Sequence, residues 1–163
     1  MPNALEPPEN PVLAPRSGAV SGLILATDPG QVRDILTSAT RIAIVGLSPN
    51  PDRPSHGVAR YLQRAGYRIV PVRPAPEGTI LGEPIVPDLR SAAKTGPVDI
   101  VNIFRRSAAI PELVNDILAV RPRLVWMQQG VEHEASAARI EAAGIPVVMN
   151  HCLAVEHHSM VEG

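Results

Sequence analysis

The chain has 163 residues, 45% of them hydrophobic, which is enough for one domain with a full core, and with one Trp, two Tyr and one Phe that core must be aliphatic. The balance of 15 basic against 16 acidic residues gives no electrostatic footprint for nucleic acid, and so few aromatic rings offer no stacking platform for bases. A single cysteine cannot form an internal disulfide, and neither an apolar run of ~18 residues nor a basic and then apolar N-terminus is present, so we expect a cytoplasmic protein without membrane contact.

Residues 1–22 contain five prolines and show no hydrophobic period, which is typical of a disordered or loosely attached arm. We therefore predict one domain over residues 23–163. Its first element is a helix over residues 23–39, with Thr27 or Asp28 as the N-cap. The predicted buried face of this helix carries Val32, Ile35 and Leu36.

From residue 41 onward, short apolar runs alternate with amphipathic segments. Strands are predicted over residues 42–45, 67–72, 98–104, 124–127 and 146–149, with a short extended piece at Ile85 and Val86. Helices are predicted over residues 55–65, 88–94, 107–120 and 132–143. Continuous apolar strands separated by amphipathic helices indicate a mostly parallel sheet of five strands with helices on both faces. The predicted fold class is therefore α/β, doubly wound.

Such sheets bind ligands outside the carboxyl ends of their strands, which selects the loops at residues 46–55, 73–78, 105–107, 128–131 and 150–152. The first loop lacks the G-x-G-x-x-G of dinucleotide-binding turns and is stiffened by three prolines. Its Gly46, the hydroxyls of Ser48 and Ser55, its free amides and Arg53 predict an anion site. The alternative is a rigid connection that binds nothing, in which Ser55 only caps the following helix.

The end of the second predicted strand discriminates between nucleotides. A NAD-binding fold usually places Asp or Glu there to bind the ribose 2′-hydroxyl, whereas this chain has Val72-Arg73-Pro74. An arginine can bind a phosphate on the ribose through bidentate contacts, so the sequence argues against NAD, which has no phosphate there. It leaves open NADP, a 3′-phosphorylated adenosine such as the head of coenzyme A, or a solvated surface arginine that binds nothing.

Several loops in order resemble those of a known family. The stretch G-L-S-P-N-P-D-R-P-S-H-G-V-A-R-Y-L at residues 46–62 is followed by I-V-P-V-R-P, I-L-G-E, V-D-I-V-N-I-F-R-R-S, V-W-M-Q-Q-G-V and V-V-M-N-H-C. Over residues 28–160, this pattern resembles the CoA-binding domain family, small bacterial proteins similar to the N-terminal domain of the succinyl-CoA synthetase α-subunit. The family's usual D-R-C is replaced here by Asn150-His151-Cys152, and asparagine is commoner where Arg73 stands.

The resemblance implies a Rossmann-like sheet that binds coenzyme A or an acyl-CoA with its nucleotide half across the strand ends. By position, the first loop would line the diphosphate, Arg73 the adenosine side, and Phe104 with its two following arginines the neighbouring loop. The candidate ligand-binding residues are Gly46, Leu47, Ser48, Arg53, Ser55, Val72, Arg73, Phe104, Arg105, Arg106, Gln128, Gly130 and Cys152.

The C-terminal stretch contains a cysteine among histidines. Cys152 follows the fifth strand, where its thiol could exchange with the thiol of bound CoA through a mixed disulfide; the alternative is a small buried hydrophobe. The set of His151, Cys152, His157 and His158 superficially resembles zinc ligands, but its spacing matches no common closed site. We therefore predict no metal and interpret this stretch as a polar extension.

No catalytic motif is present: the chain lacks G-x-S-x-G, a P-loop and H-E-x-x-H. Together with the resemblance, this favours a non-catalytic carrier, sensor or redox-buffer module that binds CoA or an acyl-CoA, and leaves the question of an enzyme open. Two alternatives stay open. One is an NADP-dependent oxidoreductase, and the other is an interaction protein with a vestigial nucleotide pocket, for which the helix over residues 107–120 could supply a homodimer face.

Overall fold

The structure, a computed structural model, describes residues 28–162. The predicted arm over residues 1–22 and the start of the first predicted helix lie outside the described residues. The described part of that helix is α1, Pro29–Ser38, whose N-cap Asp28 accepts a hydrogen bond from the backbone N–H of Gly30. Proline at the first helical position carries no N–H that would need a partner. The predicted buried face is confirmed, since Val32, Ile35 and Leu36 are buried.

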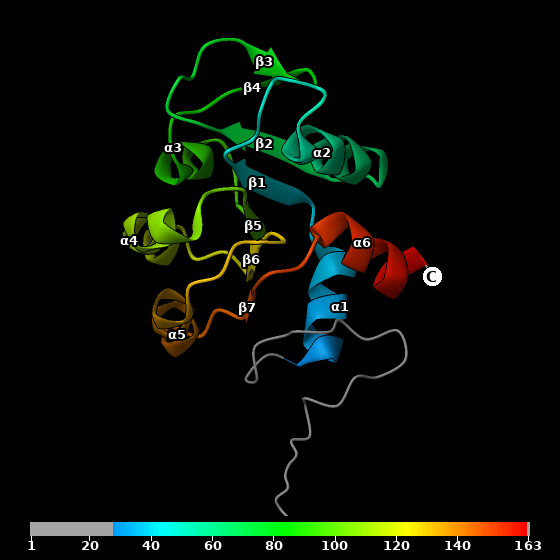
Figure 1. The fold of residues 1–163 in the computed structure, drawn as a ribbon. Helices are drawn as coiled ribbons and strands as arrows, with labels where there is room; N and C mark the ends of the chain where they lie inside the picture. Colours follow the sequence, from blue (N-terminus) through cyan, green and yellow to red (C-terminus); the bar gives the residue numbers. More distant parts are fainter. Residues whose placement is uncertain (1–27, 163) are drawn as a thin grey trace, which may run out of the picture.

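A five-stranded, all-parallel sheet forms the centre of the fold (Figure 1). Its strand order is β2-β1-β5-β6-β7, so the chain moves outward from β1 in both directions. Val86 extends the sheet by one residue beyond β2 through a parallel bridge to Val72, which confirms the predicted extended piece. The strands are β1 Arg41–Val45, β2 Arg68–Val72, β5 Ile100–Ile103, β6 Leu124–Met127 and β7 Val147–Val148.

Helices cover both faces of the sheet, and the predicted doubly wound α/β fold is confirmed (Figure 1). α1, α2 and α6 lie on one face, and α3, α4 and α5 lie on the other. The strands alternate accordingly: Ile42 and Ile44 pack under the first group, Ala43 and Val45 under the second. The remaining helices are α2 Pro54–Arg64, α3 Leu89–Lys94, α4 Ile110–Val120, α5 Glu134–Ala142 and α6 Leu153–His157.

Two local features differ from the sequence prediction. A small antiparallel hairpin, β3 Thr79–Ile80 and β4 Glu83–Pro84, follows β2, where Leu81 and Gly82 turn the chain with positive φ. The interpretation of the C-terminal stretch as a polar extension is wrong. After α6 the chain continues as a π-type turn, His158–Glu162, whose Met160 and Val161 pack against the core. The turn contacts α1, and α6 contacts α2.

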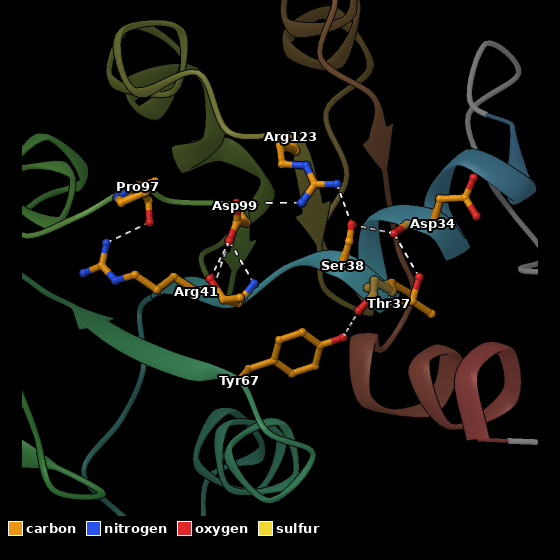
Figure 2. A network of polar contacts seen from close by, with 10 residues as sticks. Asp34, Thr37, Ser38, Arg41, Tyr67, Pro97, Asp99 and Arg123 are labelled. Atoms are coloured by element: carbon orange, nitrogen blue, oxygen red, sulfur yellow. Dashed lines mark hydrogen bonds and ion pairs between the residues drawn. The ribbon is translucent and has the colours of Figure 1, made fainter.

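At the amino ends of the strands, Asp99 joins four elements (Figure 2). Its carboxylate accepts hydrogen bonds from the backbone N–H groups of Thr40 and Arg41 at 2.9 and 3.0 Å, and lies 3.8 Å from the guanidinium of Arg123. Arg123 in turn donates to the Ser38 hydroxyl at the end of α1. Burial alone would raise the pKa of Asp99, but these hydrogen bonds outweigh it and lower the pKa below its ordinary value of 3.8.

Replacing Asp99 with alanine leaves two backbone N–H groups at this edge without their acceptor. We expect the Asp99→Ala variant to lose about 2 kcal/mol of unfolding free energy, measured as a lower urea midpoint at unchanged slope. The matched control is Asp116→Ala, which removes only an exposed ion pair with Arg90 and should cost less than about 1 kcal/mol. Equal losses in the two variants would contradict a special role for the Asp99 network.

His157 attaches the C-terminal segment to the rest of the domain. Its side chain is 3% exposed, and its Nδ1 lies 2.9 Å from the hydroxyl of Tyr61. The imidazole also packs edge-on against the rings of Tyr61 and Tyr67, and the Tyr67 hydroxyl donates to the carbonyl of Leu36 in α1. Burial lowers the pKa of His157 below 6.5, against the opposing charge of Glu162, and raises the pKa of Tyr67 to about 12.

The lowered pKa of His157 makes stability depend on pH in a defined direction. Below pH 6.5 the unfolded chain binds a proton at this histidine more readily than the folded chain does, so the unfolding free energy falls as the pH falls. We expect a urea midpoint that decreases from about pH 8 to about pH 5, and a shallower decrease in His157→Gln. The exposed His158 is the control position, and a His158→Gln variant that flattens the profile equally would contradict this assignment.

Candidate functional site

The order of the strands reverses between β1 and β5, and a cleft lies at this switch point. β1 leads to β2 on one side, whereas β5, its neighbour on the other side, begins the run to β6 and β7. The loops that follow β1, β2 and β5 border a cleft of about 440 Å³. It is lined by Gly46, Leu47, Ser48, Arg53, Pro54, Ser55, Arg73, Pro74, Phe104 and Arg105. Eight of the predicted site residues therefore meet at one place.

Side chains of the loop after β1 hold its backbone in shape. The Ser55 hydroxyl accepts a hydrogen bond from the N–H of Ser48 at 3.0 Å, and the Ser48 hydroxyl accepts one from Asn50 at 3.1 Å. The predicted cap at Ser55 is wrong, because α2 begins one residue earlier and Arg53 is the N-cap, without a side-chain hydrogen bond. The amino end of this 11-residue helix therefore faces the cleft without a capping side chain, as anion sites require.

Gly46 lets the loops after β1 and β5 approach each other closely. Its φ is +84°, and a Cβ at this position would lie 2.3 Å from the carbonyl oxygen of Phe104. The Gly46 N–H donates to Val72 at the end of β2, and the Phe104 N–H donates to Val45. These contacts join all three loops of the cleft. Gly46 is needed for the shape of the cleft floor.

Arginines dominate the charge at the cleft. Arg53, Arg73 and Arg105 line it, whereas Arg106 is exposed beside it. Arg73 extends across the cleft and donates to the Leu47 carbonyl at 3.3 Å. Among residues 28–162, none of these four arginines forms an ion pair with a carboxylate. The first cleft, which is lined by no carboxylate of the described residues, therefore carries positive charge and suits a ligand with several negative charges.

A second cleft of about 320 Å³ lies against the first, toward α3 and α4. The two share Gly46, Arg73, Pro74 and Arg105, so the arginines stand on a common wall. The remaining lining is mostly apolar: Val45, Val72, Pro87, Asp88, Leu89, Leu113 and Asp116. Of these only Val72 was predicted. Pro87, Asp88 and Leu89 could have been found by treating Val86 as a strand and examining the residues that follow its end.

Besides Arg106, three predicted site residues line neither cleft. Gln128 is buried and its side-chain oxygen accepts a hydrogen bond from the N–H of Leu153 at 3.3 Å. The N–H of Gly130 donates to the Asn150 side chain at 2.7 Å. Cys152 is half-buried, precedes α6 and packs against the core on the α2 side of the sheet. The structure thus gives each of these residues a structural role, and their contact with a ligand stays a prediction.

The histidines near Cys152 are directed to separate partners. His151 pairs with Glu156 at 3.5 Å, His158 pairs with Glu162 at 3.4 Å, and His157 contacts Tyr61. Burial raises the pKa of Glu156, although His151 opposes this effect. In the part of the chain that the structure describes, no three His, Cys, Asp or Glu residues are grouped so that they could hold a metal ion.

Two buried polar side chains near the first cleft lack hydrogen-bond partners among the described residues. They are His56, at Nδ1, and Asn102, at both Nδ2 and Oδ1. His56 follows the cleft residue Ser55, and Asn102 precedes the cleft residue Phe104 by two positions on β5. A buried polar group without a partner costs about 1–3 kcal/mol. Sequence reasoning missed both: Asn102 lies within an apolar strand, and His56 lies in the polar first turn of α2, where burial is not expected.

A comparison with known families supports what the cleft's position and charge suggest. The family model described as CoA binding domain matches residues 40–158, which include all three loops of the cleft. The chain belongs to the CoA-binding domain family. This confirms the resemblance noted in the sequence, and CoA binding is the property of the family as a whole.

Over residues 28–162, no helix is long and apolar enough to cross a membrane.

Other proteins are similar to this CoA-binding domain in sequence, and two solved structures are also similar in fold. The uncharacterized protein YneT of Bacillus subtilis is 39% identical over 127 residues, which are 78% of this chain and 92% of YneT. The structure of cell-free ID.343 from Thermus thermophilus is also 39% identical, with a TM-score of 0.77, and covers 82% of this chain and 99% of its own. A hypothetical protein from Pyrococcus horikoshii OT3 is 28% identical, with a TM-score of 0.75 and coverage of 81% and 91%.

The close approach at Gly46 generates a test of the cleft floor. A methyl group there would collide with backbone and would also strain the positive φ, so we expect Gly46→Ala to lower the unfolding free energy by about 2 kcal/mol or more. Gly57 in α2 is the matched control, because a Cβ there meets nothing within 4 Å. Gly57→Ala should stabilise the protein by up to about 1 kcal/mol. Urea unfolding measures both, and a neutral Gly46→Ala would contradict the packing described.

Proposed function

We propose that this protein binds coenzyme A or an acyl-CoA through its nucleotide part, as a carrier, sensor or redox-buffer module without catalysis of its own. The observation that carries the proposal is the set of unpaired arginines around the switch-point cleft. CoA carries a diphosphate and a 3′-phosphate, whereas NAD carries only a diphosphate. A cleft lined by three guanidinium groups, with a fourth beside it and no ion pair to a carboxylate among residues 28–162, matches the more highly charged ligand.

The two clefts suggest how the nucleotide lies. The diphosphate fits the loop after β1, where Ser48, Ser55 and Arg53 meet the amino end of α2. An adenine ring fits the second, apolar cleft, between the prolines that follow β2 and Val86. The ribose then lies beside Arg73 on the common wall, where the guanidinium binds the 3′-phosphate. Arg105 lines the same wall and can also contact the 3′-phosphate.

The lining of the first cleft supports a binding role. Its described residues are Gly, Leu, Ser, Pro, Phe and Arg, so none of them is a His, Cys, Asp, Glu or Lys that could transfer a proton near neutral pH. The oxidoreductase alternative needs a group that contacts the nicotinamide near the end of β6. Gln128 follows β6, but its side-chain oxygen already accepts a hydrogen bond from the backbone N–H of Leu153. These features favour a module that holds its ligand without converting it.

Calorimetric titration with CoA, dephospho-CoA, NADP and NAD tests the proposal. We expect CoA to bind most tightly, and removal of the 3′-phosphate to weaken binding about tenfold or more, because a charge-assisted contact is worth roughly 1.5–3 kcal/mol. Arg73→Ala should weaken CoA by a similar factor and leave dephospho-CoA unchanged. Arg68→Ala is the control, since Arg68 is exposed at the opposite end of β2 and pairs with Glu83.

The other outcomes identify the competing functions. Tighter binding of NADP than of CoA would replace this proposal with the oxidoreductase reading. Failure of all four ligands to bind would contradict the nucleotide site and favour an interaction protein. If CoA and dephospho-CoA bind equally well, the diphosphate site stands and the role given to Arg73 is wrong.

A further inference from the structure

The carboxamide of Asn102 has no hydrogen-bond partner at either end among the described residues. The side chain is 0% exposed, and neither its Nδ2 nor its Oδ1 forms a hydrogen bond within residues 28–162. A carboxamide can donate two hydrogen bonds and accept two, and at this core position none of the four is made among the described residues. Its neighbours across the sheet are Ile44 on β1 and Trp126 on β6, and the Trp126 indole N–H is already bound to the His151 carbonyl. An aliphatic residue would suit this layer better.

The position of Asn102 relates it to the cleft. It lies on β5 two residues before Phe104, and alternate residues of a strand share a face. Phe104 both lines the cleft and packs on the core of that same face, with Ile44, Leu47 and Trp126. A strand rises about 3.3 Å per residue, so the Asn102 carboxamide lies one layer, roughly 7 Å, below the floor formed by Phe104.

A ligand group that could reach this layer must be slender, uncharged and able both to donate and to accept. The diphosphate is excluded by its charge, and an adenine ring by its width. The pantetheine arm of CoA meets all three conditions, since it is a chain with two secondary amides, each with one N–H and one C=O. We propose that Asn102 is a specificity-determining residue that binds an amide of the pantetheine arm when the Phe104 side chain turns aside.

This inference rests on the proposed function and makes it more specific, because it identifies the part of the ligand that distinguishes CoA from its nucleotide. Among residues 28–162 the carboxamide has no partner, and an amide of the pantetheine arm would supply one. A ligand can favour the conformation in which Phe104 has turned aside only if it binds that conformation more tightly. The hydrogen bonds to Asn102 would supply this preference. Phe104 and Asn102 thereby act on one part of the ligand, while the arginines act on another.

The test compares CoA with 3′-phosphoadenosine 5′-diphosphate, which keeps all phosphate contacts and lacks the arm. Calorimetry of Asn102→Leu should show about tenfold weaker CoA binding than the unaltered protein, or about 1.4 kcal/mol, with unchanged affinity for the nucleotide. Asn102→Val is a second variant in case leucine does not fit the strand. The control is Ile44→Val, which alters the same layer without removing a polar group and should affect both ligands equally.

Thermal unfolding supplies an independent readout. We expect Asn102→Leu without ligand to be at least as stable as the unaltered protein, and to gain less stability from CoA. Equal affinity of the variant and the unaltered protein for CoA, or equal weakening of both ligands, would overturn the role of Asn102 while leaving the nucleotide site intact. If the unaltered protein binds neither ligand, the proposed function fails and this inference fails with it.

Discussion

The close approach of the β1 and β5 loops determines what this domain can bind. Gly46 has no Cβ, so the Phe104 carbonyl can lie where a side chain would begin, and backbone hydrogen bonds to Val72 and Val45 fix the three strand ends together. The arginines that follow β2 and β5 therefore project from a rigid base. The fold keeps these arginines close together despite their mutual repulsion, because the parallel sheet beneath them is buried on both faces. An anion relieves that repulsion.

Polar groups are satisfied very differently at the two ends of the sheet. At the amino end, Asp99 receives hydrogen bonds from Thr40 and Arg41 and lies beside Arg123, so the charges there are matched within the protein. At the carboxyl end, within the part of the chain that the structure describes, the cleft arginines form no ion pairs, and the buried Asn102 and His56 have polar atoms without partners. The first end supplies stability, and the second keeps unused interactions that a ligand can complete.

Most of the fold follows from patterns that can be read locally. The strand over residues 124–127 was predicted with its observed bounds, because a continuous apolar run between helices has few alternatives. Strand ends were less certain, since Tyr67, Val98 and Phe104 are apolar in the sequence but lie outside the hydrogen-bonded strands. The helix over residues 153–157 escaped prediction because histidines made it look polar. Only its contact with Tyr61 and Tyr67 explains why His157 is buried.

The candidate site was predictable where chemistry and topology coincide, and not where contacts join distant segments. Ser48, Arg53 and Arg73 lie in loops that follow the carboxyl ends of β1 and β2, so the rule that ligands bind at these ends selects them. Ser55 was predicted as an anion ligand, with a helix cap as the alternative; its hydroxyl lies at the cleft but accepts a hydrogen bond from the Ser48 amide, a detail that no local pattern specifies. Asn102 is the extreme case. Its position looks like ordinary strand interior, and its significance depends on the absence of partners from two neighbouring strands.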